Sequence, residues 1–255
     1  MKTISQITAF SLLTGIALAA GVAHAATWTY SGTGPANSAG LSATATAFSA
    51  SNNSTATITA STAYYNGGLG VTSNGESTGA PQHAVDNNGA IETVMISFSN
   101  GVGGLTSADK VNLTSVNFGY ASGDSDFSVY AYTGASASPT PLGVSYSSLT
   151  SNGWTLIGHY SGQSSGASYT LGTSVYSSNW LVGAYNGLGT SSRTLNAGND
   201  YFKLAALSGN KCPTTGTIPA GCGLTPPGSV PEPATLLLMG AGLLGLTRVT
   251  RRRMR

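Results

Sequence analysis

Short strand-like runs, each closed by glycine, asparagine, serine or proline, recur along most of this chain and limit the folds it can adopt. Several runs alternate between two faces: Leu113 shares the face of Val111, and Phe118 takes the opposite one. No amphipathic pattern of helical length competes with them. The clearest runs span residues 41–48, 55–60, 91–98, 111–120, 127–133, 154–160, 180–185 and 201–207. The pattern predicts an all-β domain, an antiparallel β-sandwich of the jelly-roll type.

The body of the chain is unusually poor in charge. Charged residues make up 7% of the 255 residues, against roughly 25% in an ordinary soluble protein. Hydroxyl and amide groups must therefore keep the surface soluble, which suits an exported protein. Between residues 26 and 229, four basic residues face seven acidic ones, a net charge of −3. A surface without a basic stripe excludes nucleic acid as a partner.

The N-terminal segment has the three parts of a secretory signal peptide. Lys2 supplies a positive charge, residues 7–22 form an apolar run, and an A-x-A cleavage site ends at Ala25. We expect a signal helix that signal peptidase removes by cutting between Ala25 and Ala26. A helix that stays uncleaved and anchors the protein in the membrane is the alternative.

The C-terminal segment combines a proline-flanked acid, a short apolar run and an arginine cluster. The first part consists of Val230, Pro231, Glu232 and Pro233. Its prolines forbid a regular helix and keep the motif extended, as a protease requires. A single membrane-inserting helix over residues 234–249 would rise about 24 Å, short of a hydrocarbon core of about 30 Å. The positive-inside rule keeps the arginines beyond it cytoplasmic. They include Arg248, Arg251, Arg252 and Arg253.

This arrangement resembles the PEP-CTERM sorting tag over residues 229–255. The resemblance implies processing by an exosortase, a membrane-embedded cysteine protease of exopolysaccharide-producing Gram-negative bacteria, which would cut near residues 231–233. It also implies export, a transient stay in the inner membrane, and a final place at the cell surface or in the extracellular matrix. A simple tail anchor is the alternative, because an apolar run followed by arginines would serve that purpose too.

The body resembles the exosortase-dependent surface proteins. The similarity starts in residues 81–87, continues in 92–98 and 123–134, and extends through 153–206. Members of that group are recognised mainly by their sorting tag. The resemblance therefore implies an exported surface or matrix protein, and no general enzymatic activity follows from it.

Two cysteines mark the end of the body. Cys212 and Cys222 are the only cysteines, and in an oxidising compartment such a pair forms a disulfide. The bond would close a short loop and stabilise the fold by about 2–3 kcal/mol. The chain then divides into a signal peptide (1–25), a β-sandwich domain (26–210), a disulfide loop with a Pro/Gly-rich linker (211–229) and the sorting signal (230–255).

Side-chain oxygens in two loops are candidate ligands for a Ca²⁺ ion, the one cofactor considered. Asp86 and Asn88 lie in the first loop, and Asp124 and Asp126 in the second. Loops that flank strands often supply such oxygens to Ca²⁺. The same residue types are also ordinary turn formers, so solvated turns are the alternative.

Catalytic candidates are few. His83 and Asp86 suggest a base and its orienter, and Glu76 and Glu92 a glycosidase pair, but isolated carboxylates are by default solvated at the surface. No set supplies nucleophile, base and orienter together, and the G-x-S-x-G, H-E-x-x-H and Walker motifs are absent. We expect a non-catalytic protein, with a secreted hydrolase as the alternative.

The aromatic residues leave open a carbohydrate-binding module that takes exopolysaccharide as its partner. Aromatic rings stack on sugar faces, and a neutral, hydroxyl-rich surface would not repel a polysaccharide. In the opposite interpretation the rings fill the sandwich core. The residues concerned are Tyr64, Tyr65, Tyr130, Tyr132, Trp154, Tyr160, Trp180 and Tyr185.

Overall fold

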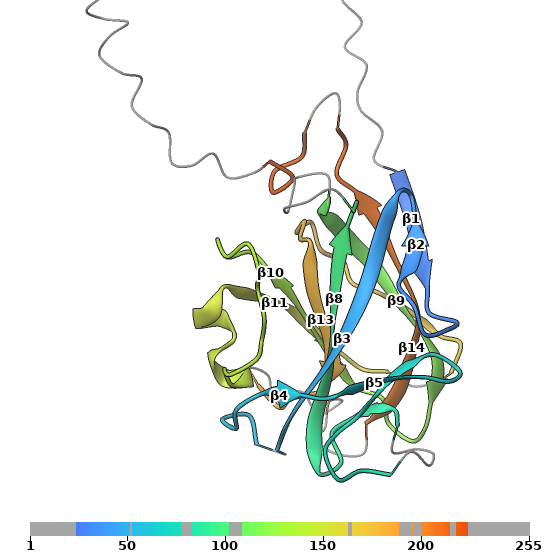
Figure 1. Ribbon diagram of the computed structural model, residues 1–255, viewed down its shortest axis with the longest axis vertical. Helices are drawn as coiled ribbons and strands as arrows, with labels where there is room; N and C mark the ends of the chain where they lie inside the picture. Colours follow the sequence, from blue (N-terminus) through green and yellow to red (C-terminus); the bar gives the residue numbers. More distant parts are fainter. Residues whose placement is uncertain are drawn as a thin grey trace, which may run out of the picture.

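A computed structural model describes most of the body of the chain and shows two antiparallel sheets of seven strands each (Figure 1). The described residues are 24–51, 53–77, 83–101, 109–162, 165–188, 195, 200–214 and 218–223. The all-β antiparallel prediction is confirmed. The expected signal helix and C-terminal helix lie outside the described residues. Among the residues that are described, no helix has the length and apolarity needed to span a membrane.

The first sheet is built around its last strand. Its members are β1 (His24–Thr29), β5 (Thr62–Tyr65), β6 (Leu69–Thr72), β7 (Val85–Asp86), β9 (Val111–Ala121), β12 (Ser168–Thr170) and β14 (Tyr201–Lys211). β14 pairs with β9 along one edge and with β1, β6 and β7 in turn along the other. Strands distant in the sequence are thereby joined, and both ends of the body meet on β14.

The second sheet has the order β11-β10-β13-β8-β3-β2, and β4 also pairs with β3. Its members are β2 (Ala36–Ser38), β3 (Leu41–Ser51), β4 (Thr59–Ala60), β8 (Ala90–Ser99), β10 (Phe127–Tyr132), β11 (Trp154–Tyr160) and β13 (Asn179–Ala184). Two short 3₁₀ turns, η2 (Tyr146–Ser148) and η3 (Thr150–Asn152), lead into β11.

Most of the expected runs are strands, but the run over residues 55–60 is a strand only at Thr59 and Ala60. Asn53 explains the difference. Its side-chain Oδ1 accepts hydrogen bonds from the backbone N–H and the hydroxyl of Thr55, which folds this segment into a turn. Six short strands were not expected from the sequence: β1, β2, β5, β6, β7 and β12.

The expected two faces of β9 are a second correction. Phe118 lies in the same core as Val111 and Leu113, not on the opposite side. The register between β9 and β14 shifts by one residue at Thr114, because Ser115 pairs with Ser208 while Leu113 already pairs with Gly209. Such a bulge rotates the rest of the strand and turns its large side chains inward.

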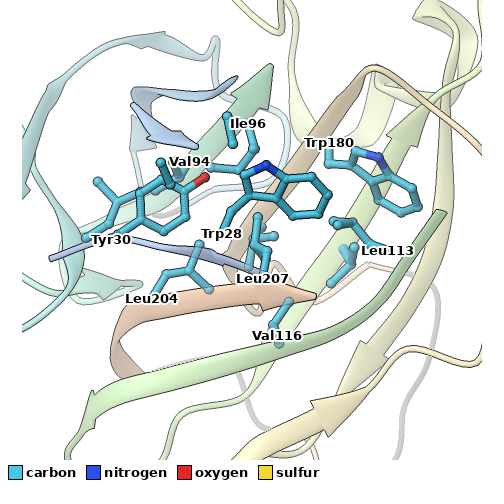
Figure 2. Packing of buried hydrophobic residues seen from close by; sticks show 14 of the residues in the cluster. Trp28, Tyr30, Val94, Ile96, Leu113, Val116, Trp180, Leu204 and Leu207 are labelled. Atoms are coloured by element: carbon cyan, nitrogen blue, oxygen red, sulfur yellow. The ribbon is translucent and has the colours of Figure 1, made fainter. Parts of the chain in front are cut away.

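The main core lies between the two sheets and centres on Trp28 (Figure 2). This side chain is fully buried, and its Nε1 donates to the carbonyl oxygen of Leu41 at 3.2 Å. Its ring meets that of Phe98 edge to face, with the ring centroids 4.7 Å apart. Trp28 thereby ties β1, the first described strand, to β3 and β8, two neighbouring strands of the second sheet.

A second apolar cluster covers the other face of the second sheet. Tyr146 of η2 and Leu149, which lies between the two 3₁₀ turns, pack in one cluster with Tyr130, Trp154 and Leu181. The second sheet is therefore buried on both faces, and the second face takes aromatic side chains that an open sheet would leave exposed.

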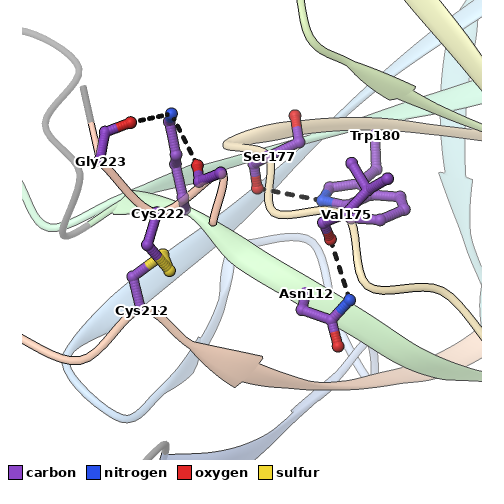
Figure 3. The surroundings of a disulfide bond; sticks show 9 residues. Asn112, Val175, Ser177, Trp180, Cys212, Cys222 and Gly223 are labelled. Atoms are coloured by element: carbon purple, nitrogen blue, oxygen red, sulfur yellow. Dashed lines mark hydrogen bonds between the residues drawn. A yellow bond between two sulfur atoms is a disulfide. The ribbon is translucent and has the colours of Figure 1, made fainter. Parts of the chain in front are cut away.

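The disulfide predicted between Cys212 and Cys222 is confirmed, with the two Cα atoms 5.5 Å apart (Figure 3). The loop it closes is fastened to the sheet by Lys110, whose Nζ donates to the carbonyl oxygens of Gly221 and Gly223 at 3.0 Å each. The body of the protein thus ends at a fixed point immediately before the linker.

Replacing Cys212 and Cys222 together by alanine is expected to lower the free energy of unfolding by about 2–3 kcal/mol, because the unfolded chain loses a cross-link. Urea unfolding of the exported protein measures this. The wild type should lose a similar amount when a reductant is added, and the double variant should not respond to the reductant. Equal stability of oxidised and reduced wild type would contradict the prediction.

Candidate functional site

Six of the seven acidic residues between residues 26 and 229 gather at one end of the sandwich, which we call the acidic end. β14 begins there, immediately after Asp200, and its first residue Tyr201 pairs with Asp86. The strand ends at Lys211, beside the disulfide and about 30 Å away at the rise of an extended strand. The six carboxyls are those of Glu76, Asp86, Glu92, Asp124, Asp126 and Asp200.

Asp124, Asp126 and Asp200 form the tighter of two groups at this end, the aspartate triad. A carboxylate oxygen of each lies within 4.8 Å of the others. Asp126 and Asp200 are fully buried, and Asp124 is half-buried. The N–H of Asp126 donates to Asp200 Oδ1 at 2.7 Å, and the N–H of Gly162 donates to Asp126 Oδ1 at 3.2 Å. Asn87 orients the third carboxyl, because its Nδ2 donates to Asp200 Oδ2.

Burial decides the protonation of Asp200. It raises the pKa of this carboxyl to about 8; the N–H of Asp126 works against the rise, and the carboxylates of Asp126 and Asp124 add to it. Three carboxylates this close repel one another, so the triad needs protons or a cation to stay compact.

Glu76, Asp86 and Glu92 form the second group. Glu92 is fully buried; its Oε2 accepts the N–H of Asp86 at 3.2 Å, and its Oε1 is buried without a hydrogen-bond partner. Burial, and after it the charges of Asp86 and Glu76, raises the pKa of Glu92 to about 10. Burial also raises the pKa of Asp86 to about 7. Glu92 is therefore protonated at neutral pH.

The burial of Glu92 corrects the expectation of a solvated carboxylate. On β8, Val94, Ile96 and Phe98 point into the core between the sheets. Glu92 precedes them at the same two-residue spacing and so faces the same way. This alternation was visible in the sequence and could have predicted the burial.

The suggested glycosidase pair is brought into one group, but Glu92 is closed to a substrate. Glu92 is fully buried, and Glu76 Oε2 accepts the N–H and the hydroxyl of Ser73 at 2.9 and 3.0 Å. A glycosidase needs both carboxyls to reach the scissile bond. The buried position of Glu92 does not fit that chemistry.

The four residues predicted to bind Ca²⁺ separate into the two groups. Asp124 and Asp126 meet Asp200, which lies far away in the sequence and carries no local signal; a bridge between Asp124 and Asp200 joins the two segments. Asp86 lies beside Glu92 instead, and Asp86 Oδ1 accepts the N–H of Asn88 at 2.9 Å.

His83 and His159 are packed as structural groups. His83 is buried, and its ring meets that of Tyr64 edge to face at 4.5 Å. His159 Nδ1 lies 2.8 Å from Ser128 Oγ, a pair that the sequence analysis missed because the two residues meet only across β10 and β11. Ser128 is 2% exposed, which closes it to a substrate.

Half of the eight aromatic candidates fill the interior. Tyr130, Trp154, Trp180 and Tyr185 are buried, which bears out the core interpretation for these four. The others, Tyr64, Tyr65, Tyr132 and Tyr160, are half-buried.

A groove of about 920 Å³ opens beside the disulfide loop, at the end opposite the aspartate triad. The half-buried rings of Tyr132 and Tyr176 line it together with the hydroxyls of Ser136 and Ser174. Tyr132 Oη accepts the N–H of Ser136 at 2.9 Å, which fixes the turn that forms one wall. The groove therefore combines rings and hydroxyl groups in one concave surface.

Comparison with known proteins identifies the C-terminal segment. Residues 229–253 match the family model described as the PEP-CTERM protein-sorting motif. No curated protein and no solved structure matches the chain significantly. The motif indicates that this is an exported protein whose sorting depends on an exosortase, by way of the membrane and toward the cell surface.

The residues of the motif itself, among them Pro231, Glu232 and Pro233, lie outside the described residues, as does the arginine cluster. The predicted cut between Ala25 and Ala26 falls within β1, where Ala26 pairs with Gly209. Both cleavage sites remain predictions, as does the resemblance of the body to the exosortase-dependent surface proteins.

Proposed function

We propose that this protein is a non-catalytic component of the cell surface or the extracellular matrix, delivered when an exosortase processes its C-terminal motif. The observation that carries the proposal is the matched sorting motif, which begins at residue 229, six residues after Gly223. Gly223 is held by Lys110, next to the disulfide. A closed body followed by a short, cuttable segment suits delivery of a whole domain.

The packing of the polar groups supports a non-catalytic role. A hydrolase needs a nucleophile that substrate can reach and a base oriented by a third group. Ser128 is closed off within the sheet, and Glu92 is fully buried. These groups stabilise the fold rather than form a reaction centre.

Intact-mass measurement of the native mature protein tests the delivery. We expect a mass that starts at Ala26 and lacks the arginine cluster, in wild-type cells only. In cells that lack the exosortase, the arginines should stay on the protein, and the protein should remain in the membrane fraction. The Glu232→Ala variant should behave in the same way, because it lacks the acid between the two prolines of the motif. Pro226→Ala, in the linker outside the motif, is the matched control and should be processed normally. Retention of Arg251 in the wild type would exclude exosortase processing.

Carbohydrate binding in the groove beside the disulfide is a second candidate. Its support is the pair of rings, Tyr132 and Tyr176, beside hydroxyl groups in one concave surface. Tyr176→Ala should weaken binding to the exopolysaccharide of the same strain, since one stacking platform is lost. Tyr64→Ala, on β5 and outside the groove, is the control. Equal binding by both variants would rule out this groove.

A further inference from the structure

The aspartate triad has the ligand chemistry of a hard-cation site. Its three carboxylates, from Asp124, Asp126 and Asp200, come from two separate segments and converge to within 4.8 Å. Carboxylate oxygens that converge in this way are the ligands that hard divalent cations prefer.

An oxygen atom without a partner lies beside the triad. Ser125 stands between two of the aspartates in the sequence and is fully buried, yet its Oγ forms no hydrogen bond. The hydroxyl packs against Gly162, where an added Cβ would lie 2.6 Å from it. The N–H of Gly162 also donates to Asp126 Oδ1. The hydroxyl of Ser125 and the carboxylate of Asp126 therefore both lie next to the backbone of Gly162. Buried hydroxyls are normally paired, and a cation would pair this one.

We propose that Asp124, Asp126 and Asp200, with Ser125 Oγ, bind one Ca²⁺ ion at the acidic end. Only oxygen atoms are offered, which excludes metals that prefer nitrogen or sulfur. Calcium accepts six to eight oxygens in irregular geometry, whereas magnesium demands a near-ideal octahedron. A site assembled from an irregular segment and the start of a strand, with half-buried Asp124 open to water, suits calcium better.

Bound calcium would join residues 124–126 to the start of β14. Because Asp200 immediately precedes that strand, the ion would fasten the acidic end as the disulfide fastens the opposite one. This role is independent of the sorting motif and goes beyond the proposed function.

Thermal unfolding of the mature exported protein, first stripped of metal with a chelator, tests the proposal. About 1 mM CaCl₂ should raise the unfolding midpoint by roughly 5–10 °C, the shift expected when ligand exceeds its dissociation constant about a hundredfold. The same concentration of MgCl₂ should give a smaller shift. Titration calorimetry should give one Ca²⁺ per chain. A midpoint that does not move with Ca²⁺, or moves equally with Mg²⁺, would overturn the proposal.

Two variants locate the site. Asp124→Asn removes a charge from the half-buried ligand, which folding tolerates best, and should weaken Ca²⁺ binding at least tenfold. Ser125→Ala should leave the metal-free midpoint unchanged or raise it, because an unpaired hydroxyl is removed, while reducing the shift that Ca²⁺ causes. If Ser125 had only a structural role, its replacement would not reduce the Ca²⁺-induced shift while leaving the metal-free midpoint unchanged. Glu76→Gln, at the same end but outside the triad, is the control of equal charge and should keep the full shift. Full Ca²⁺ response in Asp124→Asn would place the ion elsewhere.

Discussion

We expect the Trp28→Ala variant to unfold with about 3–5 kcal/mol less free energy than the wild type, a large part of the stability of an ordinary domain. The side chain is fully buried between the sheets, so its removal leaves a cavity that the rigid strands around it cannot fill. The variant also loses the bond from Nε1 to Leu41 and the edge-to-face contact with Phe98. β1 then loses its main attachment to the second sheet.

Urea unfolding followed by fluorescence or circular dichroism measures this loss. Leu142→Ala is the matched control: its side chain is 50% exposed, and its truncation should change the stability by about 0.5 kcal/mol or less. A loss of less than about 1 kcal/mol in Trp28→Ala would mean that β1 contributes little to the core.

The long strands could be predicted from sequence because their side chains alternate over enough residues to be recognised. β3, β8 and β14 are ten or eleven residues long, and each contains an expected run. The short strands could not be recognised, because β7 has only two residues and exists through its pairing with β14. The bulge at Thr114 is also a property of the pairing, so no local pattern announced it.

In the candidate site, too, residues that are close in the sequence could be predicted, whereas a residue distant in the sequence could not. Asp124 and Asp126 could be chosen from sequence because they stand together in one turn-forming segment. Asp200 reaches them only through a bridge between residues 76 positions apart, and a single sequence does not reveal such a contact. Glu92 was misjudged for another reason: a carboxyl was assumed to be solvated, although its place in the alternation of β8 turns it inward.

The charged residues are distributed unevenly between the two ends of the domain, and the sorting motif follows only one of these ends. Lys110 and Lys211 lie near the disulfide, where the chain leaves toward the sorting motif. The six carboxyls lie at the other end of β14, about 30 Å away. The sorting motif and the acidic end are thus separate parts of the protein, so a change in one can be tested without disturbing the other.

Replacing Glu92 by glutamine is expected to stabilise the protein at neutral and alkaline pH. In the folded protein the pKa of Glu92 is raised from 4.5 to about 10, so the folded state holds this proton more tightly than the unfolded state does. The resulting stabilisation is complete below about pH 4.5 and is lost as the pH rises toward 10. About 3 kcal/mol of it is gone at pH 7.

Glutamine avoids this loss because it is neutral at every pH and has a similar shape. Its oxygen can accept the N–H of Asp86, as Oε2 of the glutamate does. Glu92→Gln should therefore match the wild type near pH 4 and exceed its free energy of unfolding by about 3 kcal/mol at pH 7. Tyr146, the other titratable group that acts on Glu92, is fully buried and stays neutral over this range, since burial raises its pKa well above the usual value.

Urea unfolding between about pH 4 and pH 9, with a chelator present, measures both profiles. Part of the downward slope should persist in Glu92→Gln, because burial also raises the pKa values of Asp86 and Asp200, and these act in the same direction. Glu92→Asp is the control, since it keeps a titrating carboxyl and should keep the slope of the wild type. A wild type that gains stability as the pH rises from 5 to 9 would show that Glu92 is ionised in the folded protein and compensated by a cation or a donor.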